Sequence, residues 1–304
     1  MDKALRAERC PVCLGRRFRA FRKGTLEAAA LRADQVKITD REYGATWDLS
    51  LCLDCRHLFA DPYPSPEFLL SLYGRVEDPL YDQEAVGRSR NFESILDRLD
   101  KLRPARGELF DVGAATGILG DLARRRGWKV DGIEPSLWAV RRAEAKYGLA
   151  LRRGDFLEAE LPENRYQAVT MVDLIEHTPR PREAVGRAFR ILAPGGALVI
   201  VTPNIHSLAA RAAGRRWWHL RPGHLAYFSS RSLRRLLAEA GFRILSWRRY
   251  AWTFSLHYLL SRGRAFAGLL ESARFASFLK GVRIKLALGD SFEVYAAKEQ
   301  DPAR

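Results

Sequence analysis

The sequence predicts an α/β fold in which helices cover both faces of a mostly parallel sheet. Between residues 107 and 202, short apolar runs alternate with longer segments of helical periodicity, which is the pattern of consecutive βαβ units. A glycine-rich turn at residues 113–117 joins the first strand to the first helix, and acidic residues follow the ends of successive strands. The chain has 304 residues, enough for this domain and a small second one.

The composition indicates a folded protein, since 47% of the residues are hydrophobic. The formal net charge of +15 raises nucleic acid or an anionic membrane surface as partners. However, Arg far outnumbers Lys, Ala is abundant, and the basic residues look dispersed along the chain, as expected when a GC-rich genome favours Arg and Ala codons. We therefore do not expect a nucleic-acid partner.

Neither a membrane span nor an export signal is expected. No apolar run reaches the roughly 18 residues of a transmembrane helix, and the first nine residues lack the apolar core of a signal peptide. We expect a cytoplasmic protein, in which structural disulfides are rare.

Four cysteines form two C-x-x-C knuckles within the first 66 residues: Cys10, Cys13, Cys52 and Cys55. Two intervening residues let both sulfurs of a knuckle reach one tetrahedral ion, and the second knuckle completes a four-thiolate shell. The pattern favours a structural Zn²⁺ without an open catalytic position. Reduced structural thiols and a redox pair are the alternatives, although a redox pair needs only one knuckle. We expect the nearby His57 to be structural.

Prolines at positions 62, 64 and 66 end this cysteine-bearing region, expected to be a small domain over residues 1–66. A helical linker is expected over residues 67–106, with Ser65 capping its first helix. The elements expected before residue 107 are a strand at 46–51, a helix carrying Phe68, Leu69 and Leu72, and a helix over 91–102.

Residues 107–304 are expected to form the main domain. The expected strands are at 108–112, 129–133, 168–172, 197–202, 242–247 and 291–297. The expected helices are at 119–126, 137–147, 182–192 and 230–240. Insertions are expected at about 204–228 and 255–288.

Three acids lie at the ends of successive strand-like segments: Asp111, Glu134 and Asp155. Ligands of open α/β sheets bind at this rim. The glycine-rich turn alone is a weak signal, because dinucleotide-binding proteins have a similar one. Asp111 before the first glycine would repel a pyrophosphate but accept from an amine, and the spacing departs from G-x-G-x-x-G.

These segments resemble the class I S-adenosylmethionine-dependent methyltransferases. LFDVGAATGILGDLARRRGWKVDGIEPS (109–136) resembles motif I and the acidic loop of that family. GDFLEAELPENRYQAVTMVDLIEHTPRPREAVGRAFRILAPGGALVIVTPN (154–204) resembles its later motifs. The resemblance implies a Rossmann-like, seven-stranded sheet whose last strand is antiparallel.

The resemblance also implies how S-adenosylmethionine is bound. Asp111, Gly113, Ala115 and Gly117 would surround the methionine part, Glu134 the ribose, Asp155 and Phe156 the adenine, and Asp173 would line the pocket. Ala115 departs from the family pattern, because many members have glycine there; the small side chain is expected to be tolerated.

The N-terminal region resembles a zinc-ribbon leader of small-molecule methyltransferases, through the cysteine knuckles, the run 58–66 and the Tyr73-Gly74 pair. Many such enzymes act on sugars, glycan precursors or other secondary metabolites, which implies a similar acceptor here, with O-methylation favoured. The longer sugar C-methyltransferases carry a further C-terminal domain that this chain is too short to hold.

Two histidines are candidates for the base that a hydroxyl acceptor needs. His177 follows Glu176 near the cofactor rim, in a Glu-His pair resembling that of small-molecule methyltransferases, and is the first candidate. His224 lies in the 204–228 insertion and is the second. A structural hydrogen-bonding role is the alternative for each.

Helical periodicity over residues 256–278 predicts an amphipathic segment. Its apolar residues are Leu259, Leu260, Phe266, Leu269 and Leu270. They fit a lid over the acceptor, or a surface that faces a partner or the membrane periphery. The sequence does not predict an oligomeric state.

Two other functions compete. One is a non-catalytic zinc-ribbon protein whose methyltransferase-like domain contacts nucleic acid. The three acids at the rim argue against it, because a domain that had lost cofactor binding would not need them. The other is an NAD-dependent oxidoreductase, which conflicts with Asp111 and with the glycine spacing.

Overall fold

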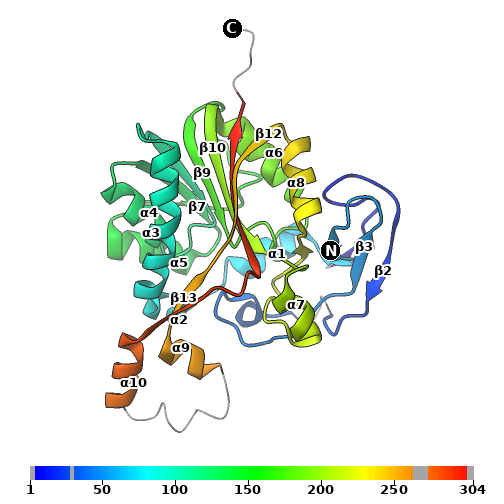
Figure 1. The fold of residues 1–304 in the computed structure, drawn as a ribbon, viewed down its shortest axis with the longest axis horizontal. Coiled ribbons are helices and arrows are strands. Elements are labelled where there is room, and N and C mark those ends of the chain that lie inside the picture. The colour runs from blue at the N-terminus through cyan, green and yellow to red at the C-terminus, as the bar shows by residue number, and fades with distance from the viewer. Residues whose placement is uncertain (1–3, 28–30, 263–272, 300–304) are drawn as a thin grey trace.

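A seven-stranded sheet forms the centre of the molecule (Figure 1). The computed structural model describes residues 4–27, 31–262 and 273–299. The strands, in their order across the sheet, are β12 (Phe242–Arg249), β15 (Ser291–Lys298), β10 (Leu192–Pro203), β9 (Tyr166–Val172), β6 (Glu108–Val112), β7 (Lys129–Glu134) and β8 (Arg152–Arg153).

Neighbouring strands from β10 to β8 run parallel, and β15 is antiparallel to both β10 and β12. The seven-stranded sheet with an antiparallel last strand is therefore confirmed. Strand β8 lies in the strand-like segment before Asp155, for which no bounds were predicted, since its two residues are too few to show periodicity.

Helices cover both faces of the sheet, as predicted (Figure 1). On one face lie α3 (Ala85–Leu102), α4 (Ile118–Arg125) and α5 (Leu137–Tyr147). On the other lie α6 (Pro181–Ile191) and α8 (Ser230–Glu239). Successive residues of β6 divide between these layers: Leu109 packs in the core with α3 and α4, and Phe110 in the core with α6 and α8.

Helix α3 begins six residues earlier than the expected start at residue 91. Its first two turns carry no periodic apolar face, and Val86 there is 56% exposed. The apolar face starts at Phe92 and packs on the sheet through Ile95 and Leu96. Helical periodicity therefore located only the packed part of the helix.

The N-terminal region forms a four-stranded sheet with a strand from the other half of the chain. Its order is β11 (Ala226–Tyr227), β4 (Leu58–Ala60), β3 (Leu49–Cys52) and β2 (Phe18–Arg22). Val12 and Phe59 share a core cluster with Leu233 and Leu236 of α8. The smaller elements nearby are β1 (Ala4–Leu5), η2 (Ala33–Val36), β5 (Tyr63–Pro64), α1 (Pro66–Tyr73), α2 (Pro79–Gln83), α7 (Leu208–Ala213) and η3 (Gly214–Arg216).

Helical periodicity was expected over residues 256–278. The described part of this stretch contains helix α9 (Leu256–Ser261) and the start of helix α10 (Ala273–Gly281), and both lie at the end of a ribbon formed by β13 (Trp252–Ser255) and β14 (Arg283–Leu286). Phe266, Leu269 and Leu270 lie outside the described residues. Within the described part of the chain, no helix is long and apolar enough to cross a membrane.

Candidate functional site

A cavity of about 210 Å³ opens at the carboxyl ends of the parallel strands, where the sequence places the acids. The predicted site residues that line it are Gly113, Ala115, Glu134, Asp155, Phe156, Asp173 and His177. Its remaining walls are largely apolar and come from α1, the start of α5 and the residues before α6. We call this the main cavity.

Glu134 connects the glycine-rich turn to the second strand. Its carboxylate accepts hydrogen bonds from the backbone amides of Ala115 (2.9 Å) and Ser136 (2.9 Å). Burial raises the pKa of Glu134. A buried carboxylate at a strand end can accept from two neighbouring hydroxyls of a bound ligand.

The backbone of Ala115 has a φ of +48°, in the left-handed region that favours glycine. The glycine common at this position in the resembling family fits that conformation. Asp173, at the end of β9, also has a positive φ of +50°. Ala115 and Asp173 both line the main cavity, and the surrounding structure holds their backbones in the left-handed conformation.

Asp111 does not line the main cavity but an adjoining one of about 40 Å³, together with Asp173 and Arg88. Asp111 is 4% exposed and accepts a hydrogen bond of 2.6 Å from the Thr170 hydroxyl. Burial raises the pKa of Asp111 and that of Asp173 to about 7 each. Two such carboxyls favour a cationic group between them.

Arg88 is a site residue that sequence reasoning missed. It projects from α3, its guanidinium lies 3.8 Å from the ring centre of Tyr81, and it lines the small cavity. Its charge opposes the rise in the pKa of Asp173. Arg88 can pair with a ligand carboxylate. No motif marks it, because its turn of α3 lacks the apolar periodicity that would have shown a helix there.

Gly117 was predicted to surround the methionine part but lines neither the main cavity nor the small one. It precedes α4 with a φ of +78°, and an added Cβ would lie 2.9 Å from Cβ of Ala143 in α5. Gly117 therefore lets two helices approach closely and turns the chain into α4.

His177 lies between the main cavity and a buried polar cluster. Its Nδ1 is 2.9 Å from the hydroxyl of Tyr73, and its ring meets that of His224 edge-on at 4.7 Å. Burial lowers the pKa of His177 to about 3, lowers that of His224 well below its usual value, and raises that of Tyr73. His177 is therefore a neutral imidazole at pH 7.

His224 is 3% exposed and lies behind His177, away from the main cavity. Glu176 is 1% exposed, and one of its oxygens accepts a hydrogen bond of 2.8 Å from Thr202. Among the described residues, the other Glu176 oxygen and Nδ1 of His224 have no hydrogen-bond partner. Ligand atoms of Glu176, His177 and His224 lie within 4.8 Å of one another, so these residues could also hold a metal ion.

Residues 36–40 bring the N-terminal region to the cavity. Val36 and Ile38 line the main cavity, and Asp78 at the start of α2 accepts from the amide of Thr39 at 3.0 Å. Arg221 donates to the carbonyl of Ile38 at 2.8 Å and pairs with Asp40. Sequence reasoning missed this wall, because its contacts join segments more than 30 residues apart.

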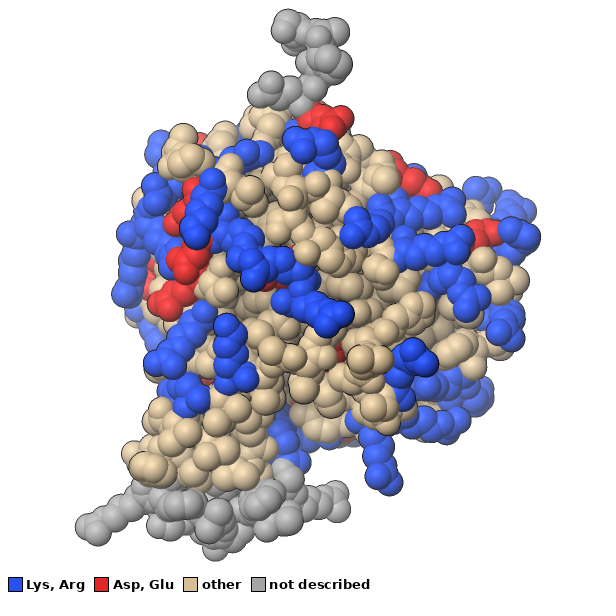
Figure 2. Space-filling model, in the orientation of Figure 1, with Lys and Arg blue, Asp and Glu red and all other residues tan. Residues whose placement is uncertain are grey.

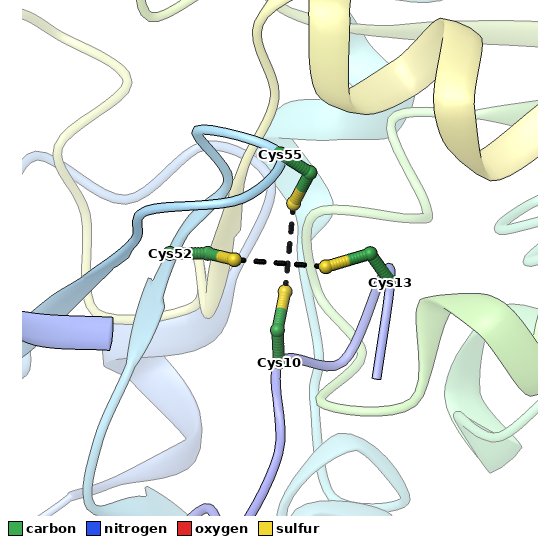
Figure 3. A group of neighbouring side chains, drawn as sticks. All are labelled: Cys10, Cys13, Cys52 and Cys55. Carbon is green, nitrogen blue, oxygen red and sulfur yellow. Dashed lines mark hydrogen bonds between the residues drawn. The ribbon is translucent and has the colours of Figure 1, made fainter. Parts of the chain in front are cut away.

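The four cysteine sulfurs converge on one point (Figure 3). Sγ of Cys10 lies 3.6 Å from that of Cys55, and Sγ of Cys13 lies 3.6 Å from that of Cys52. A tetrahedral zinc ion with bonds of about 2.3 Å requires sulfurs about 3.8 Å apart. The four thiols are free of disulfides and fit such an ion. His57, beside the second knuckle, is fully buried and lies between the rings of Phe59 and Phe228.

The sheet and the acids at its rim define a class I S-adenosylmethionine-dependent methyltransferase domain. The family described as "Methyltransferase domain" matches residues 87–246, and the chain belongs to it.

Two curated relatives show the extent of the sequence similarity. Over 102 residues the chain is 35% identical to "Ubiquinone biosynthesis O-methyltransferase" of Alkalilimnicola ehrlichii, covering 32% of this chain and 41% of that protein. Over 156 residues it is 28% identical to "Probable S-adenosylmethionine-dependent methyltransferase" of Mycolicibacterium smegmatis, covering 51% and 59%. The chain thus matches about two fifths to three fifths of these relatives' length.

Among solved structures, the YcgJ protein of Bacillus subtilis is similar with a TM-score of 0.50 and 14% identity, covering 69% of this chain and all of that one. A geranyl diphosphate C-methyltransferase of Streptomyces coelicolor A3(2) has a TM-score of 0.49 and 17% identity, covering 69% of this chain and 79% of that one. At 14% identity the similarity to the YcgJ protein shows the fold alone.

Proposed function

We propose that this protein transfers the methyl group of S-adenosylmethionine to a hydroxyl of a small molecule, a sugar, glycan precursor or other secondary metabolite. The observation that carries the proposal is the placement of a neutral His177 on the wall of a cavity with acids at its strand ends. The name of the 35% identical relative, an O-methyltransferase, supports oxygen as the acceptor atom.

In this proposal the two cavities bind the methyl donor. Asp111 and Asp173 would receive its ammonium group and Arg88 its carboxylate, beside the turn from Gly113 to Gly117. Glu134 would accept from the ribose hydroxyls with the lone pairs that its two amide partners leave free. Asp155 and Phe156 would bind the adenine, since both line the main cavity.

His177 would act as the general base. If its Nδ1–H donates to the Tyr73 oxygen, and the Tyr73 hydroxyl donates to the carbonyl of Gly223 (3.5 Å), Nε2 remains as the proton acceptor. His224 would orient His177 from behind instead of touching the acceptor. In-line transfer then requires chiefly alignment and exclusion of water, to which the wall formed by Val36 and Ile38 contributes.

Replacing His177 with alanine is expected to lower turnover about 10²- to 10⁴-fold, the usual contribution of a general base. The affinity for S-adenosylmethionine, measured by calorimetry, should change less than about threefold, because residues other than His177 bind this methyl donor. Turnover is measured with labelled methyl donor and the acceptor found by screening hydroxyl-bearing metabolites.

The matched control is His206→Ala, because His206 is exposed and lies outside both cavities. Unchanged turnover of the His177 variant would remove it from the mechanism. No heat of binding with S-adenosylmethionine in the wild type would contradict the proposed function itself.

Donor affinity should depend on pH through Asp111 and Asp173. A pKa of about 7 means that each is largely protonated below pH 7, whereas the donor's ammonium group requires the ionised forms. Affinity should therefore fall as the pH is lowered below 7, by at most roughly a hundredfold per unit if both protons are released on binding, and level off above it. Calorimetry between pH 5.5 and 8.5 checks this. Asp111→Asn should bind more weakly with a flatter profile; an equally steep profile in that variant would assign the dependence to another group.

A further inference from the structure

The N-terminal region contains a basic segment that the apparent dispersal of charge conceals. Residues 9–26 include no acid and six basic residues: Arg9, Arg16, Arg17, Arg19, Arg22 and Lys23. Five of these six fall within residues 16–23, interleaved with Phe18 and Phe21. The expectation of dispersed basic residues is wrong for this segment.

Strand β2, which carries the segment, is the outer strand of its sheet and pairs only with β3. Ala20 pairs with Ser50 and Arg22 with Leu49, so Phe21 is the extra residue of a bulge. A bulge redirects a side chain, and Phe21 is 48% exposed, with the guanidinium of Arg22 5.9 Å from its ring centre. We call the side chains of residues 16–23 the β2 surface.

Few acids neutralise the β2 surface. Asp48 pairs with Lys23 at 2.7 Å, and Asp54 pairs with Arg17. The two basic side chains are 85% and 77% exposed, so both pairs are weak and can exchange for other anions. Arg16, Arg19 and Arg22 have no ion pair with an acid among the described residues.

Further basic side chains continue this surface. Arg215 of η3 lies close enough to contribute, after burial, to the lowered pKa of Arg22. Figure 2 shows Lys and Arg side chains gathered on the side of the molecule that holds β2 and β3, with few acids between them.

We propose that the β2 surface binds single-stranded nucleic acid, with phosphates against the arginines and a base stacked on Phe21. Proteins that bind single-stranded nucleic acid use exposed aromatic rings surrounded by basic side chains. A lipid surface would need a broader apolar area than Phe21 and the neighbouring exposed Leu14 and Leu53 provide, and an acidic protein would need no stacking platform. No residue of β2 lines the main cavity, so this site is separate from methyl transfer.

The test is fluorescence anisotropy with the full-length protein and labelled 12-residue oligo(dT) and oligo(U). Binding should weaken with salt at a log–log slope of about −2 to −3, as for three or four phosphates on a single strand. Arg19→Glu with Arg22→Glu should weaken it at least roughly tenfold. Phe21→Ala, which leaves the charge unchanged, should weaken it roughly tenfold through lost stacking.

The matched control reverses two exposed arginines outside the β2 surface, Arg141→Glu in α5 with Arg190→Glu in α6, and changes the net charge equally. Its affinity should stay within about threefold of the wild type. An equal loss in this control, or no effect of Phe21→Ala, would overturn the proposal, as would tighter binding to phosphatidylglycerol vesicles than to the oligonucleotides. Binding of S-adenosylhomocysteine should be the same in all variants, which separates this result from the proposed methyl transfer.

Discussion

Replacing Cys52 with serine is expected to abolish zinc binding and to unfold the N-terminal region. The four sulfurs already lie at nearly the spacing that a zinc ion requires, and such sites contribute roughly 10–16 kcal/mol of binding free energy. That range overlaps the roughly 5–15 kcal/mol net stability of a typical domain. An empty site is therefore expected to cost the region free energy comparable to its whole stability.

The damage should extend beyond the knuckles. Val12, Cys52 and Phe59 share a core cluster with residues of α8. In addition, β11, which comes from the C-terminal half of the chain, completes the N-terminal sheet. Residues 36–40, which wall the main cavity, lie between the two knuckles. We therefore expect donor binding to fall together with the melting temperature.

Metal content by plasma mass spectrometry and thermal unfolding check this prediction. The wild type should hold one zinc ion per chain. Leu53→Ser is the matched control, because Leu53 lies between two cysteines and is 43% exposed; it should keep the metal and the melting temperature. A Cys52→Ser protein that melts like the wild type would show that the thiols need no ion.

Replacing Glu134 with alanine is expected to weaken S-adenosylmethionine binding about 100-fold. The carboxylate now holds two backbone amides at 2.9 Å each, and in the proposed complex it would hold two ribose hydroxyls. Each hydrogen bond to a charged group is worth about 1.5–3 kcal/mol, so their joint loss costs about 3 kcal/mol or more. Glu134→Gln, which keeps the shape and one acceptor, should lose less.

Calorimetric titration with S-adenosylmethionine measures the effect. Glu108→Ala is the matched control, since Glu108 begins β6 at the opposite end of the sheet and pairs with Arg165 on the surface. Its affinity should equal that of the wild type. An affinity of Glu134→Ala within about threefold of the wild type would place the ribose elsewhere.

Local sequence signals located the sheet and its helices closely. Helix α5 has the predicted bounds of residues 137–147, because Ser136 caps its start and Gly148 ends it with a φ of +59°. The strand β6 also has its predicted bounds, 108–112. Both elements combine a regular apolar pattern with end signals that lie within a few residues of it.

Contacts between distant segments left no such signal. Tyr73 and His177 are 104 residues apart in the sequence and 2.9 Å apart in the structure. Strand β11 has two residues and gains its place only by pairing with β4, more than 160 residues earlier. Periodicity and spacing describe neighbours in the chain, so they cannot show which side chains a fold brings together.

The sequence by itself determined the class of fold, the acids at the strand ends and the four-cysteine set, because each depends on short-range pattern and residue chemistry. Only the tertiary structure decided which of these residues face a cavity: Asp173 and Glu134 do, whereas Gly117 and His224 support residues that do. It also made residues 36–40 a wall of the site and turned Phe21 to the surface. Burial and pairing across the fold determine these placements, and neither is a property of a short stretch of chain.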